Sequence, residues 1–243
     1  MELRLPFQVD YFLVGADNRM RLSSLLRLFQ EAAIRHADKR GFGGPDLALK
    51  GWGWVLYKLE AEIFRYPLFE EEVEVTTRIG GWKGMKAYRH FELRSKEETL
   101  AGAVSVWSLI DVASRRPLPL NEELFSSVAS QPGFPPAVPA REWKPARDFQ
   151  PQEETRITTR WSDFDTNGHV NNTTYADYLE TALVRQGESP RPSRFRIQYR
   201  QEISRQVGEV RVALAAAPGG WFFRVGYGDQ VCAVGETALI TGG

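Results

Sequence analysis

The chain has 243 residues, of which 42% are hydrophobic and 26% charged, so it can fill a core and is not an intrinsically disordered protein. It holds 31 basic and 31 acidic residues, a formal net charge of zero, which argues against a general nucleic-acid-binding protein because such proteins carry a basic excess. The single cysteine, Cys232, excludes an intrachain disulfide and a cysteine-based zinc cluster.

No secretory or membrane-inserted segment is expected. The N-terminus lacks a basic stretch followed by an apolar run, and no run of 18 apolar residues occurs anywhere. We therefore predict a cytoplasmic protein without membrane insertion. His36, His90 and His169 lie far apart in the sequence, and we predict neither a metal site nor a cofactor. His36 and His90 have no local acidic partner pattern and are interpreted as structural.

The first half predicts one helix followed by four strands. Apolar residues recur at helical spacing from Leu22 to Ala37, and Gly41 ends the run. Segments rich in β-branched and aromatic residues follow, separated by short turns, at 54–64, 71–82, 86–96 and 100–112. Strands joined by short turns pair antiparallel. This half therefore predicts an α+β layer in which a long helix packs against an antiparallel sheet.

Proline divides the chain near its middle. Eight of the 14 prolines lie between Pro117 and Pro151, and proline is excluded from helix interiors and central strands. We predict an extended linker over 131–150. It would separate an N-terminal domain, 1–130, from a C-terminal domain, 151–243.

The second half repeats the layout of the first. A helix is predicted over Tyr175–Leu183 and ends at Gly187, with Asn171 or Asn172 as N-cap, or Thr174 and Asp177 as a capping box. Strands are predicted at 193–203, 208–216, 220–228 and 231–240. We interpret the repetition as an internal duplication that aligns His169 with Arg21, or Glu202 with Glu62.

The segment before the second helix concentrates polar residues suited to catalysis. Asp165, Asn167 and His169 alternate, so in an extended segment they would point to one side. His169 can move a proton near neutral pH, Asp165 can orient it or activate water, and Asn167 can position water or substrate. Free N–H groups at the start of the helix could hold an oxyanion. The first half has Arg21 in place of His169, so only the second half is expected to be catalytic.

Two simpler interpretations compete for this segment. It could be a polar loop that only caps a helix. It could also bind calcium, because Asp163, Asp165, Asn167 and Gly168 fit the first positions of an EF-hand loop. Position 12, however, is Thr174 instead of the bidentate glutamate, and the preceding residues are β-prone.

Two motifs carry a family resemblance. Asp163-x-Asp165-x-x-Gly168-His169-Val170-Asn171-Asn172-x-x-Tyr175 resembles the signature of hotdog-fold thioesterases, and its core resembles that of acyl-ACP thioesterases. Tyr199-Arg200-Gln201-Glu202 is similar to the Y-R-x-E motif of the same family. The resemblance implies two tandem hotdog domains, each a long helix against an antiparallel sheet, and hydrolysis of fatty acyl-ACP to free fatty acid.

The resemblance also implies the roles of individual residues. Asp165, Asn167 and His169 would be catalytic, and Glu202 would activate the attacking water. Plant relatives have a cysteine after that glutamate, but this chain has Ile203, and Cys232 lies in an apolar run typical of a packing residue. No G-x-S-x-G serine elbow is present. Direct attack by water and a transient acyl-aspartate both remain open.

One pattern counts against Glu202. Phe195, Ile197 and Tyr199 alternate as the apolar face of their strand, which puts Glu202 on the opposite face with Arg200. A β-bulge near Gln201 would return the glutamate to the site.

The first half is expected to form the acyl-chain pocket, with Leu25, Leu26, Phe29 and Trp54 as candidate lining residues, although an ordinary core explains them equally well. The family implies acyl carrier protein, which is acidic, as partner. Seven arginines against three glutamates between Arg185 and Arg211 could attract it, or form a solvated strand face. An acyl-CoA thioesterase and a catalytically silent acyl-binding protein remain alternatives, and a homodimer is left open.

Overall fold

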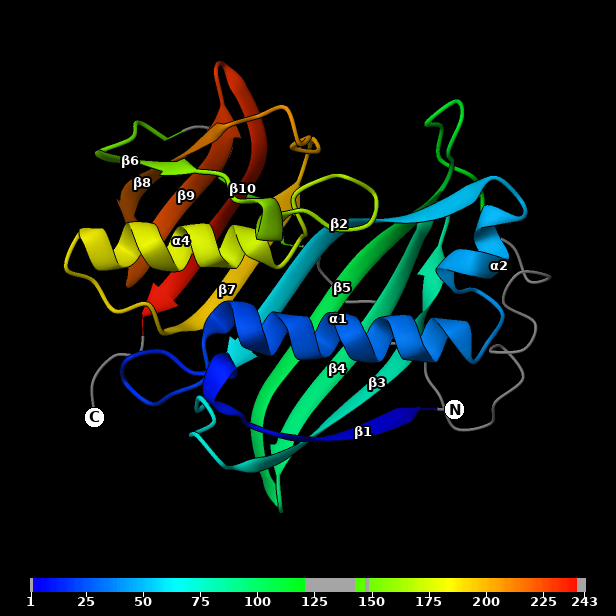
Figure 1. Cartoon of the computed structure of the whole chain (residues 1–243), viewed down its shortest axis with the longest axis horizontal. Coiled ribbons are helices and arrows are strands. Elements are labelled where there is room, and N and C mark those ends of the chain that lie inside the picture. The colour runs from blue at the N-terminus through cyan, green and yellow to red at the C-terminus, as the bar shows by residue number, and fades with distance from the viewer. Residues whose placement is uncertain (1, 121–142, 147–148, 240–243) are drawn as a thin grey trace.

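The computed structural model describes residues 2–120, 143–146 and 149–239 (Figure 1). The N-terminal half contains β1 (Leu3–Gln8), the 3₁₀ turn η1 (Tyr11–Leu13), α1 (Leu22–Asp38), α2 (Gly44–Ala48), β2 (Trp52–Ile63), β3 (Glu72–Lys83), β4 (Lys86–Ser95) and β5 (Glu98–Asp111). The C-terminal half contains β6 (Glu153–Thr158), the 3₁₀ turn η2 (Trp161–Asp163), α4 (Thr174–Arg185), β7 (Pro192–Tyr199), β8 (Glu209–Ala217), β9 (Gly220–Tyr227) and β10 (Gln230–Leu239).

The ten strands of the described residues form one antiparallel sheet in the order β1-β3-β4-β5-β2-β7-β10-β9-β8-β6. The halves join where β2 pairs with β7, from Lys58 opposite Gln198 to Glu62 opposite Arg194. Both long helices lie across the same face of the sheet (Figure 1) and contact each other. The predicted α+β class is confirmed, and the sheets of the two halves are continuous.

Each long helix packs its apolar stripe onto the sheet. Leu22, Leu25 and Phe29 of α1 are at most 1% exposed, and Phe29 stacks on Phe91 of β4 with ring centroids 4.9 Å apart. Burying one such side chain stabilises the fold by about 1.5–3 kcal/mol. The predicted helix ends are confirmed, because left-handed glycines follow α1 at Gly41 (φ 72°) and α4 at Gly187 (φ 75°).

Cys232 of β10 is fully buried in this core, and burial raises the pKa of its thiol to about 11. The thiol is therefore protonated at neutral pH, as expected of a packing residue. The predicted linker over 131–150 lies mostly outside the described residues, so the domain boundaries at 130 and 151 stay a prediction. Among the residues that are described, no helix is long and apolar enough to cross a bilayer.

The structure gives the register of the duplication directly. Bridges join Val14 to Met20 in the first half and Phe164 to Val170 in the second, while Arg19 bridges Leu68 as His169 bridges Ser204. Arg19 therefore occupies the position of His169. The predicted alignment of His169 with Arg21 is wrong by two residues, since α1 begins three residues after Arg19 whereas α4 begins five residues after His169.

Candidate active site

The polar segment before α4 is a closed turn and not an extended strand. The Asp165 N–H donates to the His169 carbonyl (2.9 Å), and the Gly168 N–H donates to the Asp165 carbonyl (3.0 Å). Gly168 has φ 78°, in the left-handed region that glycine adopts without strain. The expected alternation of Asp165, Asn167 and His169 along one side is therefore wrong. The turn instead places Asp165 and His169 opposite each other at its base.

Within this turn, the three predicted site residues have different environments. Asp165 is half-buried, and its Oδ1 accepts the backbone N–H of Asn167 (2.8 Å), which is a typical Asx turn. Asn167 lies at the exposed tip. The His169 side chain is 28% exposed. The carboxylate of Asp165 thus holds the turn that presents the other two side chains.

Asp163 anchors the turn to the fold. It is 1% exposed, and its carboxylate accepts hydrogen bonds from the Arg160 backbone N–H (2.9 Å), the Arg160 Nε (3.0 Å) and the Tyr178 hydroxyl of α4 (2.9 Å). Both oxygens are engaged by protein donors. This arrangement contradicts the calcium-loop alternative, in which Asp163 would be the first ligand.

The start of α4 is already satisfied by Asn171. Its Oδ1 accepts the Thr173 N–H (2.9 Å), and its backbone carbonyl accepts the Thr174 N–H (2.9 Å). The N-cap position itself is Thr173, which has no side-chain cap, but the Asn171 side chain bonds the start of the helix as expected of an N-cap candidate. The Thr174–Asp177 capping box does not form, and Asp177 instead pairs with Arg27 of α1. Asn171 thus engages two of the expected oxyanion donors, the N–H groups of Thr173 and Thr174.

A β-bulge brings Glu202 to His169. After β7, the N–H groups of Arg200 and Gln201 both donate to the carbonyl of Cys232, at 2.8 and 3.1 Å. Because these two residues lie opposite a single residue of β10, the side chains that follow them turn to the other face of the sheet. Oε2 of Glu202 consequently lies 3.3 Å from Nε2 of His169. The structure joins the two sequence motifs in one site.

Tyrosines also connect the two motifs. The hydroxyl of Tyr199 donates to the Asn172 carbonyl (2.8 Å), and the Tyr175 ring of α4 stands edge-on to Tyr199 with centroids 5.3 Å apart. Burial raises the pKa of both phenols above the usual range. Both phenols are therefore neutral, and the Tyr199 hydroxyl ties β7 to the segment before α4.

Arg115 is a residue of this site that the sequence analysis missed. It lies in the turn after β5, in the N-terminal half, and its Nη1 is 2.8 Å from Oε2 of Glu202. The same carboxylate oxygen thus faces Arg115 and His169. No motif surrounds Arg115, and 87 residues separate it from Glu202, so only the pairing of β2 with β7 could have revealed it.

The equivalent loop of the N-terminal half lacks these groups. Its turn has the same hydrogen bonds, from Gly15 to Arg19 (2.8 Å) and from Asn18 to Gly15 (3.0 Å). The bulge is repeated as well, since Phe64 and Arg65 both donate to the carbonyl of Leu100. Tyr66, and not Glu62 as aligned above, therefore occupies the position of Glu202.

Three of the four candidate pocket residues lie together, and the fourth lies apart from them. Leu25, Leu26 and Phe29 belong to the main core. Trp54 packs against a second cluster around Leu47 at the end of the sheet covered by α2, and its indole N–H donates to the Phe42 carbonyl (3.2 Å). Their role in an acyl pocket stays a prediction.

Most arginines of the predicted basic segment are neutralised by carboxylates. Arg191 pairs with Glu180 and Asp17, Arg194 with Glu62, Arg196 with Glu60 and Glu236, and Arg211 with Glu154. Sheet pairing brings in carboxylates from distant parts of the sequence, and these reduce the excess of positive charge in this segment. Arg200 and Arg205 are exposed without an ion pair to any described residue, and Arg205 lies against Gly168.

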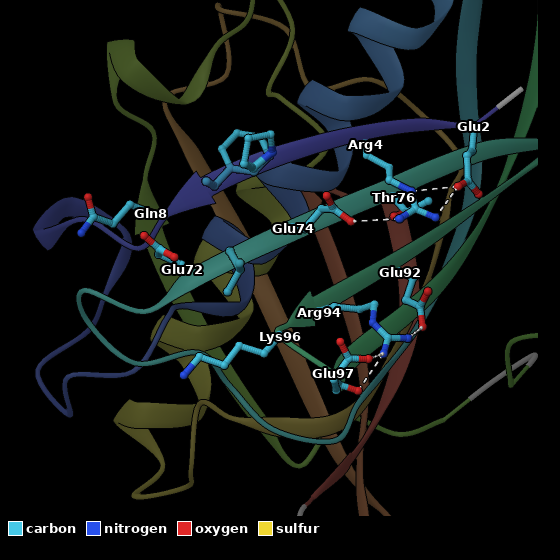
Figure 2. Close-up of a pocket in the computed structure, with 13 residues that line it drawn as sticks. Glu2, Arg4, Gln8, Glu72, Glu74, Thr76, Glu92, Arg94, Lys96 and Glu97 are labelled. Carbon is cyan, nitrogen blue, oxygen red and sulfur yellow. Dashed lines mark hydrogen bonds and ion pairs between the residues drawn. The ribbon is translucent and has the colours of Figure 1, made fainter.

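A second concave surface lies on the outer strands of the N-terminal half, apart from the residues above. Figure 2 shows its charged side chains paired with one another, Arg4 with Glu2 and Glu74, and Arg94 with Glu92 and Glu97. It is lined by β1, β3 and β4. Across the described residues, no group of three or more His, Cys, Asp or Glu side chains is arranged to hold a metal ion.

Comparison with known proteins gives matches along most of the chain. The model of the acyl-ACP thioesterase N-terminal domain matches residues 3–128, and that of the C-terminal domain matches residues 146–214. A chloroplastic palmitoyl-acyl carrier protein thioesterase of Gossypium hirsutum is 29% identical over 215 residues, which are 82% of this chain and 51% of that protein. A chloroplastic dodecanoyl-[acyl-carrier-protein] hydrolase of Cinnamomum camphora is 28% identical over 233 residues, 89% and 60% of the two chains. The chain spans about half the length of the curated relatives it matches.

Two solved structures show the same fold. An acyl-ACP thioesterase from Bacteroides thetaiotaomicron is 24% identical, with a TM-score of 0.81 over 98% of this chain and 97% of that one. A 12:0-ACP thioesterase from Umbellularia californica is 22% identical, with a TM-score of 0.82 over 98% and 96%. At this identity the likeness establishes the double hotdog architecture.

Proposed function

We propose, since the chain belongs to the acyl-ACP thioesterase family, that it hydrolyses a fatty acyl-ACP to a free fatty acid and holo-ACP. The observation that carries the proposal is the contact between Glu202 and His169, whose Oε2 and Nε2 atoms are 3.3 Å apart. A carboxylate beside an imidazole can move a proton near neutral pH. Both groups are partly exposed, so water and substrate can reach them.

Glu202 is proposed as the base that activates water. Its Oε2 faces Arg115 and His169, whereas its Oε1 accepts no hydrogen bond from the described residues. Oε1 takes a proton from water as the water oxygen attacks the thioester carbonyl carbon. The protonated carboxyl of Glu202 passes a proton to Nε2 of His169, which lies 3.3 Å from its Oε2. The carbon–sulfur bond then breaks, and His169 gives this proton to the leaving sulfur as general acid, so that Glu202 is ionised again. Atoms and charge balance, with one water consumed per thioester.

Asp165 and Asn167 are proposed to position the reacting groups. Asp165 holds the backbone of the turn through the N–H of Asn167, and the exposed amide of Asn167 is available to bind the thioester carbonyl. This bond of Asp165 favours a positioning role over an acyl-aspartate nucleophile. Mass spectrometry of the rapidly quenched enzyme is expected to show no covalent acyl adduct. An acylated Asp165 peptide would refute the water route.

Acyl carrier protein is proposed as the carrier of the acyl group. Arg200 and Arg205, on either side of Glu202 in the sequence, are exposed cations that an acidic carrier would meet at the site. The rate with acyl-ACP is then expected to fall as salt increases, because exposed charges are screened.

Release of free thiol from acyl-ACP and acyl-CoA substrates of several chain lengths tests the proposal. His169→Ala and Asp165→Ala are each expected to lower turnover at least ~100-fold while the protein stays folded. Glu202→Gln is expected to lower it similarly, and Glu209→Gln, which removes an exposed carboxylate of the same half, serves as the control. A preference for acyl-CoA would refute the carrier assignment. Tight fatty-acyl binding without thiol release would indicate a silent binding protein.

A further inference from the structure

We infer that Arg115 of the N-terminal half is a positioning residue that holds the Glu202 carboxylate in place against His169 of the C-terminal half. This inference rests on the proposed function, because it assigns a purpose to a contact within the same site. Nη1 of Arg115 approaches Oε2 of Glu202 to 2.8 Å, a distance typical of a charge-assisted hydrogen bond.

Arg115 and His169 contact the same oxygen of Glu202, and this explains what Arg115 does at the site. Arg115 and His169 both face Oε2, at 2.8 and 3.3 Å, so the guanidinium fixes the orientation of the carboxylate. With Oε2 held, Oε1, which accepts no hydrogen bond from the described residues, is left for water. Without the guanidinium the carboxylate can rotate and pair with the imidazole alone.

The turn that carries Arg115 is internally braced. Oδ1 of Asp111 accepts the N–H and the hydroxyl of Ser114, at 2.8 and 2.6 Å, and the Asp111 N–H donates to the Arg116 carbonyl (3.0 Å). The bonds from Ser114 lower the pKa of Asp111, so its carboxylate is ionised and accepts both bonds at neutral pH. The turn is also tied to Gly51 through the N–H of Val112 (2.9 Å).

The backbone of Arg115 itself is unusual. It has φ 56°, in the left-handed region where a residue with a Cβ is strained by about 1 kcal/mol or more. Glycine or asparagine would occupy this position with less strain. A function of the guanidinium, which bonds the Glu202 carboxylate of the other half, explains why an arginine stands at this position.

Other charged or titratable groups close to the Glu202–His169 pair set the background against which Arg115 acts. They are Asp165 across the closed turn, Tyr175 from α4, and Arg200 and Arg205, which lie close to Glu202 in the sequence. The Tyr175 phenol is neutral because burial raises its pKa, so it contributes no charge.

Steady-state kinetics with acyl-ACP test the inference through four variants. Arg115→Ala and Arg115→Gln are expected to lower kcat about tenfold with little change in KM, and Arg115→Lys, which keeps the charge, to restore most of the rate. The acidic limb of the pH–rate profile is expected to move to higher pH in the Ala and Gln variants, because loss of a nearby cation favours the protonated forms of the pair. Arg116→Ala is the matched control, since its side chain makes no hydrogen bond or ion pair with described residues.

Other kinetic outcomes overturn the inference. A raised KM with unchanged kcat would mean that Arg115 binds the carrier instead of positioning Glu202. Equal behaviour of Arg115→Ala and Arg116→Ala would mean that the contact has no catalytic consequence.

A second measurement separates this inference from the proposed function. The imidazole resonance of His169, assigned by comparison with His169→Gln, is followed by NMR during a pH titration. Its midpoint is expected to move to higher pH in Arg115→Ala and to stay near the wild-type value in Arg115→Lys. If the protein hydrolyses no thioester and the midpoint still moves, the proposed function fails, but the effect of Arg115 on the Glu202–His169 pair stands. If thiol release is normal and neither kcat nor the midpoint changes in the Arg115 variants, only the positioning role of Arg115 fails.

Discussion

Replacing Glu180 of α4 tests how the two halves are held together. This carboxylate is 8% exposed and lies at the N-terminus of α1, where its Oε1 accepts the Leu22 N–H (2.8 Å). Oε1 also lies 3.0 Å from Nη1 of Arg191, and Nη2 of Arg191 is 2.8 Å from Oδ1 of Asp17. Glu180→Gln keeps an oxygen for the donors on Oε1 and removes the charge, while an NH₂ group replaces Oε2, which accepts the Ser23 N–H at 3.5 Å.

Burial outweighs the hydrogen bond from Leu22 and the charge of Arg191, and it raises the pKa of Glu180 from 4.5 to about 6. The folded state therefore holds this proton more tightly than the unfolded chain does. The resulting stabilisation is fully present below pH 4.5 and is lost as the pH rises through about 6. A rise from 4.5 to about 6 corresponds to about 2 kcal/mol.

Urea unfolding at about pH 4.5 and about pH 7.5 measures this contribution. The free energy of unfolding of Glu180→Gln, relative to wild type, is expected to increase by about 2 kcal/mol between the two values. Glu153→Gln, at an exposed position of β6, controls for general effects of surface charge. A relative gain by the wild-type protein as the pH rises would refute the reasoning, because the ion pair with Arg191 would then outweigh burial.

Three further changes test other parts of the fold. Hydrogen bonds from Arg65 lower the pKa of Glu71 to about 2. The wild type should therefore be more stable than Glu71→Gln above pH 4.5 and lose that advantage as the pH falls toward 2. Equal thermal midpoints of the two proteins near neutral pH would contradict this. Tyr178→Phe removes a hydrogen bond to the buried Asp163 carboxylate and should cost about 1.5–3 kcal/mol in urea unfolding, whereas no change would mean that Arg160 alone holds the carboxylate. Gly235→Ala should cost about 3 kcal/mol, since a Cβ there would meet the Arg196 carbonyl and the Phe223 ring, and an unchanged thermal midpoint would show that the sheet can adjust.

Periodicity was sufficient to predict the two long helices and the eight strands that follow them, because helix and strand patterns are local, but it did not predict the short helix α2. The eight strands after the helices and the stops at Gly41 and Gly187 lie within a few residues of the predicted positions. The pairing of β2 with β7 depends on contacts between residues far apart in the sequence, and local patterns contain no information about it. The same limit applies to Arg115.

The site was predictable only in composition. His169 and Glu202 come from recognisable motifs, but their contact depends on a closed turn and a bulge. Strict alternation gave the wrong side for Glu202, and the alternative of a bulge near Gln201 is the one that forms. A bulge adds one residue and turns the following side chains to the other face. The Asx turn takes the segment of His169 out of the extended conformation that alternation assumes.

The two duplicated loops have different roles, one at the proposed catalytic site and the other in binding Arg191 between the halves. In the C-terminal half the turn presents Asn167 and His169, and the bulge presents Glu202. The equivalent positions in the N-terminal half are Asp17, Arg19 and Tyr66, and these bind Arg191, which contacts the Asp17 carboxylate (2.8 Å), the Arg19 carbonyl (3.3 Å) and the Tyr66 ring (5.5 Å). A buried cation held by one loop stabilises the contact between the halves. That contact in turn keeps Arg115, on the N-terminal half, within reach of Glu202. Weakening the Arg191 cluster is therefore expected to lower turnover as well as stability, although none of its residues touches the proposed catalytic pair.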